Sequence, residues 1–231
     1  MDIPLYPCIT LTNVLIYFHG FVNAGIAMNV QYRVVPGYWV QHDTLEVNGW
    51  VLRSRLEFAR AHGGDERLQR VLEALDEKER SIWTSVDINA WYDVRQIEPF
   101  ERELARQLGL DEETAYIRMG EFSAERAFHP ERGHYRRFLG QPPEVFLKLA
   151  AKWQNEYYNT GLTEYYPTGV TACMIRTRYI PYTTRSNCLS NLGFFRRSIE
   201  ILGGQKVKAE ERRCVAHGDE WCEFHFSWQS E

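Results

Sequence analysis

The chain has 231 residues, of which 44% are hydrophobic and 25% are charged, a composition that excludes pervasive disorder. Its net charge of −4 and the lack of a basic block argue against nucleic-acid binding, which needs a positive surface that displaces counterions. The N-terminal sequence lacks the basic region and cleavage site of a signal peptide, and its apolar runs are shorter than the ~18 residues of a membrane span. We therefore expect a cytoplasmic protein without a membrane span.

The first 50 residues have the composition of β-structure. Residues 9–18 and 30–35 are rich in β-branched and aromatic side chains, and turn residues follow each run. We predict an N-terminal β-rich segment over residues 1–47, of unknown role, and one larger domain over residues 48–231.

Apolar residues recur at helical spacing after Gly49. Leu52, Leu56 and Ala59 define a first helix, which stops at Gly63-Gly64. Further helices are predicted for residues 65–83, 97–108, 111–128 and 142–158.

Strands return after Gly161. They are predicted for residues 162–166, 171–180, 206–216 and 221–228, with one helix at residues 184–202. The last two strands are joined by a tight turn at residues 217–220. The elements together indicate an α+β fold in which helices pack on one side of an antiparallel sheet.

The terminal hairpin and the helix before it carry a candidate metal site. Cys214 and Cys222 flank the turn, so both sulfurs can lie on one side of the hairpin. Glu211 reaches the same place if its strand bends or bulges. Cys188 lies near the start of the helix, where the helix N-terminus favours the thiolate that zinc requires. Three thiolates and a carboxylate suit a tetrahedral structural zinc with no open position for a catalytic water.

Other interpretations of these residues stay open. An odd count of five cysteines in a cytoplasmic chain argues against a disulfide framework and favours metal binding or buried thiols. The spacing of Cys214 and Cys222 is not that of a zinc finger or ribbon, so a buried cysteine pair also explains it. His217 and His225 are alternative ligands. His129 and His134 are better explained as solvated loop histidines than as metal or heme ligands, because no third ligand lies near them in sequence.

The same motif resembles a known domain family. The stretch Cys188-Leu-Ser-Asn-Leu-Gly-Phe-Phe, followed by Glu211-x-x-Cys214-x-x-x-Gly-Asp-x-x-Cys222-x-Phe, is similar to the 4-vinyl-reductase-type domain. It resembles most the version in the aromatic-sensing N-terminal domains of phenol- and xylene-responsive activators. In that family three cysteines and one glutamate hold a structural zinc, which the resemblance carries over to Cys188, Glu211, Cys214 and Cys222. Residues 48–228 also resemble a myxobacterial paralogous family of unknown function.

The resemblance further implies a pocket beside the zinc hairpin. In the sensors a closed apolar cavity takes a phenol or alkylbenzene, and a histidine and a tryptophan read the hydroxyl. The position of the sensors' histidine falls near Phe146 in this chain. Because phenylalanine cannot hydrogen-bond to a hydroxyl, a phenol is not the expected ligand. We expect a small hydrophobic ligand, for which an aromatic molecule is a candidate. The candidate lining residues are Phe146, Trp153, Tyr157, Tyr165 and Tyr166, for each of which ordinary core packing is the alternative.

These features predict a non-catalytic sensory or regulatory module that binds a small hydrophobic molecule and signals through a protein partner. The sequence has no dinucleotide fingerprint, nucleophile elbow or zinc-deaminase motif, so we expect no enzyme activity. The alternative is a scaffold or adaptor, because the fold type resembles both vesicle-tethering subunits and heme-NO-binding domains. An enclosed cavity favours the sensor and a filled core favours the scaffold. Relatives of this fold are mostly homodimers, so a homodimer is expected.

Overall fold

The computed structural model of this chain describes residues 32–35, 38–41 and 43–230. These residues belong to one compact unit. The strand predicted at residues 9–18 lies outside the described residues. The prediction of β-structure at residues 30–35 is confirmed by β1 (Tyr32–Val35), which pairs antiparallel with β2 (Tyr38–Gln41).

The first helices follow the predicted pattern only in part. Helix α2 (Gly49–Ala74) begins after Asn48, whose side chain accepts a hydrogen bond from the Trp50 amide. It is interrupted at Gly64, where φ is 70°, close to the predicted break. The single helix predicted at residues 65–83 is wrong, because α2 ends at Ala74 and α3 (Glu77–Thr84) starts anew. Asp76 caps α3 and forms a capping box with Glu79, which fixes this second start.

The next helices have clear start and stop signals. Helix α4 (Glu98–Leu108) ends at Gly109, which takes the left-handed conformation with φ of 66°. Helix α5 (Glu112–Ala127) is capped by Asp111. The helix predicted at residues 142–158 is shorter, because α6 (Pro143–Ala150) gives way to a 3-10 helix at Ala151–Glu156.

The C-terminal half forms a four-stranded antiparallel sheet. Its strands β5 (Leu162–Gly169), β6 (Ala172–Arg178), β7 (Gln205–Arg213) and β8 (Cys222–Gln229) lie in the order β5-β6-β8-β7. Helix α7 (Arg185–Ile201) connects β6 to β7 and is capped by Thr184. Strand β7 ends before residue 216, the predicted end, because the chain turns into a 3-10 helix at Val215–His217.

A small second sheet was not predicted. Strand β3 (Glu46–Asn48) pairs antiparallel with β4 (Trp91–Asp93). Both strands have three residues, too few to show a period of two in the sequence. Strand β3 crosses the predicted boundary between residues 47 and 48, and the Asn48 amide donates to the Tyr157 carbonyl at 2.9 Å.

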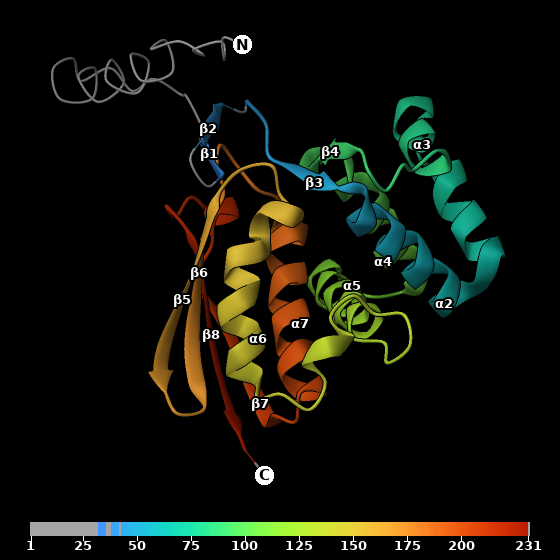
Figure 1. Cartoon of the computed structure of the whole chain (residues 1–231). Coiled ribbons are helices and arrows are strands. Elements are labelled where there is room, and N and C mark those ends of the chain that lie inside the picture. The colour runs from blue at the N-terminus through green and yellow to red at the C-terminus, as the bar shows by residue number, and fades with distance from the viewer. Residues whose placement is uncertain (1–31, 36–37, 42, 231) are drawn as a thin grey trace, which may run out of the picture. The chain divides into compact units, whose positions relative to one another are not determined.

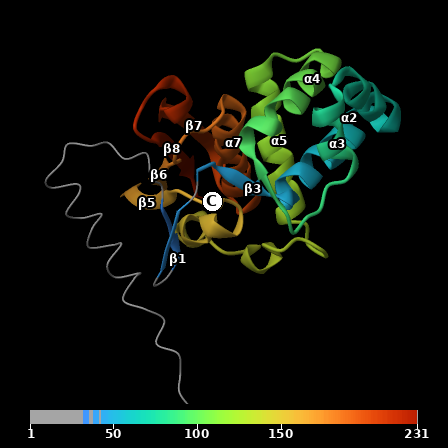
Figure 2. The ribbon, with the colours of Figure 1, turned by 90° about the horizontal axis from the view of Figure 1, so that it is seen from above.

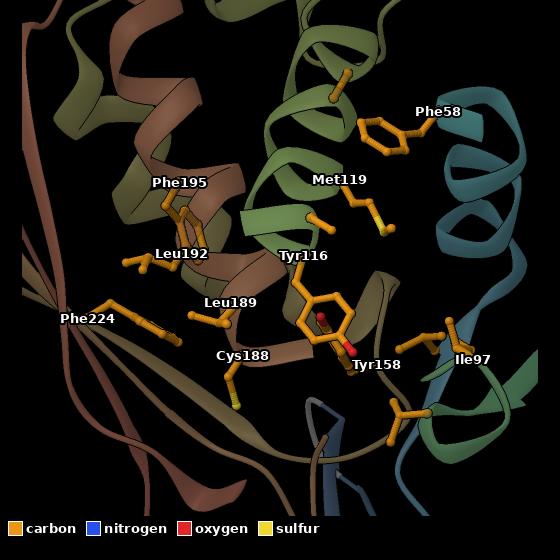
Figure 3. Packing of buried hydrophobic residues seen from close by; sticks show 14 of the residues in the cluster. Phe58, Ile97, Tyr116, Met119, Tyr158, Cys188, Leu189, Leu192, Phe195 and Phe224 are labelled. Atoms are coloured by element: carbon orange, nitrogen blue, oxygen red, sulfur yellow. The ribbon is translucent and has the colours of Figure 1, made fainter. Parts of the chain in front are cut away.

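The elements stack in layers, and the predicted α+β fold with helices on one side of the sheet is confirmed. Helix α7 lies between the sheet and α5, as Figures 1 and 2 show. On the sheet side of α7, Leu189 and Phe195 pack in the same core as Phe224 of β8 (Figure 3). On the far side, Tyr116 of α5 and Phe58 of α2 continue the core away from the sheet (Figure 3). Among the described residues, no helix has the length and apolarity needed to cross a bilayer.

Helices α5 and α7 contact each other through their backbones. A Cβ at Gly120 would overlap the carbonyl oxygen of Ser190, and a Cβ at Gly193 would overlap that of Ile117. Only glycine permits this approach. The contact fixes the position of α7, which carries residues of both sites described below.

Candidate metal centre and ligand cavity

Four side chains that the sequence singles out come together at one end of α7. The ligand atoms of Cys188, Glu211, Cys214 and Cys222 all lie within 4.8 Å of one another. Cys188 comes from the first turn of α7, Glu211 from β7, and the other two cysteines from the ends of the β7–β8 connection. The register of β7 against β8 shifts just after Glu211, which supplies the irregularity that this donor set requires.

The connection between β7 and β8 is held in shape by its own hydrogen bonds. The Cys214 amide donates to the Asp219 carboxylate at 2.8 Å, and the Asp219 amide donates back to the Cys214 carbonyl at 3.1 Å. Gly218 adopts φ of 96°, which allows the chain to reverse. The Val215 amide donates to the Cys222 sulfur at 3.4 Å. The loop therefore presents two sulfurs in a fixed geometry.

Glu211 has one oxygen paired and one oxygen free. One carboxylate oxygen pairs with Arg185, and the same guanidinium lies 3.5 Å from the Cys214 sulfur. The other oxygen, Oε1, is buried and has no hydrogen-bond partner in the described part of the chain. Burial raises the pKa of Glu211 to about 7. An unpaired buried carboxylate oxygen beside three sulfurs is a donor set suited to a cation.

The three thiols lie close together without forming a disulfide. All three are buried and unpaired covalently, and the sulfurs of Cys188 and Cys222 are 3.1 Å apart. Hydrogen bonds from the thiols of Cys188 and Cys222 lower the pKa of Cys214, while hydrogen bonding to Cys214 raises the pKa of Cys188. A cation bound here would displace the remaining thiol protons. The alternative ligand His225 pairs with Glu223 at 2.8 Å instead.

A cavity of about 870 Å³ lies on the other side of the start of α7. Its wall combines residues of α2, α5, the segment 132–158, β5, β6 and α7. At its rim are the exposed side chains of Trp50 and Arg53. Aromatic rings of Tyr135, Tyr157 and Phe194 form part of the wall.

Of the five predicted pocket residues, Tyr157 lines this cavity and the other four lie elsewhere. Phe146 is fully buried among neighbouring aromatic rings, and Trp153 packs against the same cluster. Tyr165 is half-buried on β5. Tyr166 faces the opposite side of the sheet, where the guanidinium of Arg176 lies 5.6 Å from its ring centroid. Apart from Tyr157, the cavity is therefore formed by residues that the resemblance did not indicate.

The closed part of the cavity carries polar side chains that sequence reasoning missed. We call this the buried polar end and define it by the residues Arg55, Tyr158, Tyr179, Asn187, Ser190 and Asn191. Arg55 is 4% exposed and donates to Glu101 at 2.6 Å, to Ser190 at 2.6 Å and to Ser123 at 3.1 Å. Glu101 is itself 2% exposed, so the ion pair is shielded from water. A charged residue on the inner face of a predicted helix was the available signal.

Two asparagines of α7 connect the rest of the buried polar end. The Asn191 amide nitrogen lies 2.8 Å from the Tyr158 hydroxyl and 2.9 Å from the Tyr179 hydroxyl. The Tyr158 hydroxyl donates to the Asn187 side chain at 2.9 Å. Burial raises the pKa of Tyr158 to about 12, so this phenol stays protonated as a donor.

At the rim, His134 belongs to a short chain of hydroxyls. The Tyr135 hydroxyl donates to that of Tyr157 at 3.1 Å, and the Tyr157 oxygen lies 2.7 Å from His134 Nε2. Burial lowers the pKa of His134, which favours the neutral ring as the acceptor at the end of this chain. His129, the other loop histidine, does not line the cavity.

The fold is similar to that of H-NOX proteins. An Fe(II) unliganded H-NOX protein from K. algicida superposes with a TM-score of 0.58 at 9% identity, covering 80% of this chain and 97% of that one. An H-NOX domain from Shewanella oneidensis in the Fe(II)CO state gives a TM-score of 0.61 at 14% identity, covering 80% and 99%. A structure from work on heme distortion in the H-NOX family gives 0.58 at 12% identity, covering 79% and 95%. These identities show a shared fold. Neither a protein-family model nor a curated protein matches the sequence.

Proposed function

We propose that this chain is a non-catalytic sensory module that holds a structural zinc and binds a small organic ligand in the cavity beside it. The observation that carries the proposal is the position of α7. Its first turns supply Cys188 to the metal cluster and Asn187, Ser190 and Asn191 to the cavity wall. A shift of this helix caused by ligand binding in the cavity would therefore also move Cys188 in the metal cluster.

Zinc is the metal that this donor set favours. Three cysteine sulfurs and one carboxylate oxygen match the soft and borderline ligands of tetrahedral zinc sites. Oε1 of Glu211 supplies the fourth donor, while its other oxygen stays paired with Arg185. The positive charge of Arg185 offsets the excess negative charge of three thiolates and a carboxylate around a divalent ion. With four protein ligands the ion has no position for substrate, so we propose a structural role.

Heme does not suit the residues of this cavity, although the structurally similar H-NOX family includes heme proteins. An axial ligand is needed, and the lining contains one histidine, His134, whose Nε2 is held by Tyr157. The wall also carries Arg55, Ser190 and Asn191. The carboxylates of a heme could pair with such groups, so it is the lack of a free histidine as axial ligand that argues against heme. We therefore propose a smaller organic ligand.

The cavity also favours the sensor over the scaffold alternative. A volume of about 870 Å³ is in the range of small-molecule sites, whereas a scaffold needs no internal space. Signalling through a protein partner and self-association as a homodimer are further parts of the proposal. Light scattering on the full chain tests the second, and a monomeric mass would contradict it.

Metal content measured by mass spectrometry on untagged protein tests the zinc site. We expect about one zinc per chain in the wild type and none in Cys214→Ser. The matched control is Cys173→Ser, because Cys173 is also fully buried on the sheet but lies outside the cluster. This control should retain its zinc. A folded wild type without zinc, or equal loss in both variants, would contradict the proposal.

A further inference from the structure

The buried polar end has hydrogen-bonding capacity that the protein itself does not use. A guanidinium carries five N–H donors, and Arg55 directs three of them to Glu101, Ser123 and Ser190. The other two N–H groups have no acceptor within the described ranges. Because Arg55 lines the cavity and is 4% exposed, a molecule in the cavity is the available source of an acceptor.

Asn191 offers the complementary group on the facing helix. Its amide nitrogen lies within hydrogen-bond distance of three acceptors, the hydroxyls of Tyr158 and Tyr179 and the carbonyl of Asn187, so both of its N–H groups are engaged. Its amide oxygen accepts from no donor in the described part of the chain. The cavity therefore presents unused donors from Arg55 and an unused acceptor from Asn191.

The charge of Arg55 is already balanced. Glu101 lies 2.6 Å away and is buried with it, and the pair as a whole is neutral. A carboxylate ligand at this end would be a second buried anion facing one cation, and burying an uncompensated charge is strongly unfavourable. A neutral acceptor, such as the carbonyl oxygen of an amide, takes the free N–H groups without this penalty.

The wall above the buried polar end is aromatic. Tyr135, Tyr157, Phe194 and Phe195 line the cavity, and such rings favour contact with a flat ring system. A long alkyl chain without a polar head would fill the apolar wall but would leave the donors of Arg55 unpaired.

We propose that the cavity recognises an uncharged aromatic molecule carrying a carboxamide-like head, whose carbonyl accepts from Arg55 and whose N–H donates to Asn191. This inference rests on the proposed function and specifies the ligand class of the same cavity. The head lies at the buried polar end and the ring lies between the aromatic side chains.

Four probes with one ring and different heads test the proposal. They are naphthalene, 1-naphthol, 1-naphthamide and 1-naphthoate, titrated by calorimetry into the zinc-loaded full chain. We expect 1-naphthamide to bind about tenfold more tightly than naphthalene, as a hydrogen bond to a charged donor implies. We expect 1-naphthoate to bind more weakly than 1-naphthamide by a similar factor.

Two variants assign the selectivity to Arg55. In Arg55→Leu/Glu101→Leu both members of the pair become apolar, so neither is left buried and unpaired. In this variant 1-naphthamide and naphthalene should bind with about equal affinity. The matched control is Arg53→Leu, on the same helix and lining the same cavity, but with a side chain that is 57% exposed. This control should keep the preference.

The outcomes separate the inference from the proposed function. If 1-naphthoate binds most tightly, or if naphthalene and 1-naphthamide bind equally, the cavity binds ligands but the ligand class is wrong. If the double variant still binds 1-naphthamide more tightly than naphthalene, Arg55 does not bind the carboxamide head. If no probe binds the folded, zinc-loaded protein, both the inference and the ligand-binding function are overturned.

Discussion

The two faces of α7 use the same few residues of helix for different chemistry. On the sheet side, Cys188 lies beside three other candidate donors, one of which, Glu211, has a carboxylate oxygen without a hydrogen-bond partner in the described part of the chain. On the cavity side, Asn187, Ser190 and Asn191 belong to a network that contains its own balanced ion pair. The first face presents a donor set suited to a cation, whereas the second presents hydrogen-bonding groups suited to a neutral molecule. The same helix can therefore serve an ion and a neutral molecule without competition between them.

The two faces also differ in how far apart their residues lie in the sequence. Three of the four candidate metal ligands belong to one hairpin, so their spacing is visible in a short stretch. In the cavity, the hydrogen bond from Arg55 to Ser190 joins residues 135 positions apart. Such a pair is defined only when α2 and α7 have packed. The following changes test whether the faces are separate and how strongly they are coupled.

Glu101→Leu should have the largest effect and should act on the cavity side alone. It leaves Arg55 buried without its partner, and we expect the free energy of unfolding to fall by about 3–5 kcal/mol. Urea unfolding of the zinc-loaded protein measures this. The double variant Arg55→Leu/Glu101→Leu should recover most of the loss. Zinc content should be unchanged in both, and loss of zinc in Glu101→Leu with a folded chain would show that the faces are not separate.

Gly120→Ala should affect both faces, because it pushes α5 away from α7. The new Cβ overlaps the Ser190 carbonyl, and we expect destabilisation of about 3 kcal/mol. The control is Gly169→Ala, whose Cβ would meet its nearest atom at an ordinary 3.4 Å. Chemical denaturation of the two variants compares them. Equal stability of both would contradict the close contact between the helices.

Removal of the metal should lower the ligand affinity of the cavity, and this effect should be smaller than those of the two substitutions above. Without an ion, Cys188 loses its anchor and the start of α7 is less well fixed. We expect the affinity for 1-naphthamide to fall about tenfold after chelation and to return when zinc is added back. Calorimetry before and after chelation measures this, with Cys173→Ser as a variant that should respond like the wild type. An affinity that does not change would mean that the two faces are independent.

The smallest effect is expected at His134. Burial lowers its pKa below the ordinary value of about 6.5, so the unfolded chain takes up this proton before the folded chain does. Stability from this residue is therefore present above about pH 6.5 and is lost as the pH falls through the folded pKa. Thermal melts from pH 7 to 5 should show a steeper decline for wild type than for His134→Gln. Parallel curves would remove His134 from the hydroxyl chain of Tyr157 and Tyr135.

Features set by residues close together in the sequence could be predicted, whereas features that depend on the packing of separate elements could not. The break at Gly64 and the stop at Gly109 are marked by the glycines themselves, and three of the four candidate metal donors lie within one hairpin. The new helix start at Asp76 is also marked in the sequence, by the capping box with Glu79, although the helical spacing there predicts one continuous helix over residues 65–83. Strand β4 had no readable pattern, because three residues form a strand only when β3 lies beside them. The cavity wall follows the same rule, since it depends on how separate helices pack.

Arg185 of α7 joins the candidate metal site to a helix that supplies none of its donors. It holds one oxygen of Glu211, approaches the Cys214 sulfur and also pairs with Glu113 of α5 at 3.0 Å. The positions of two of the four donors therefore depend on how α5 packs against α7. A substitution on α5 can thus alter the donor geometry from outside the hairpin.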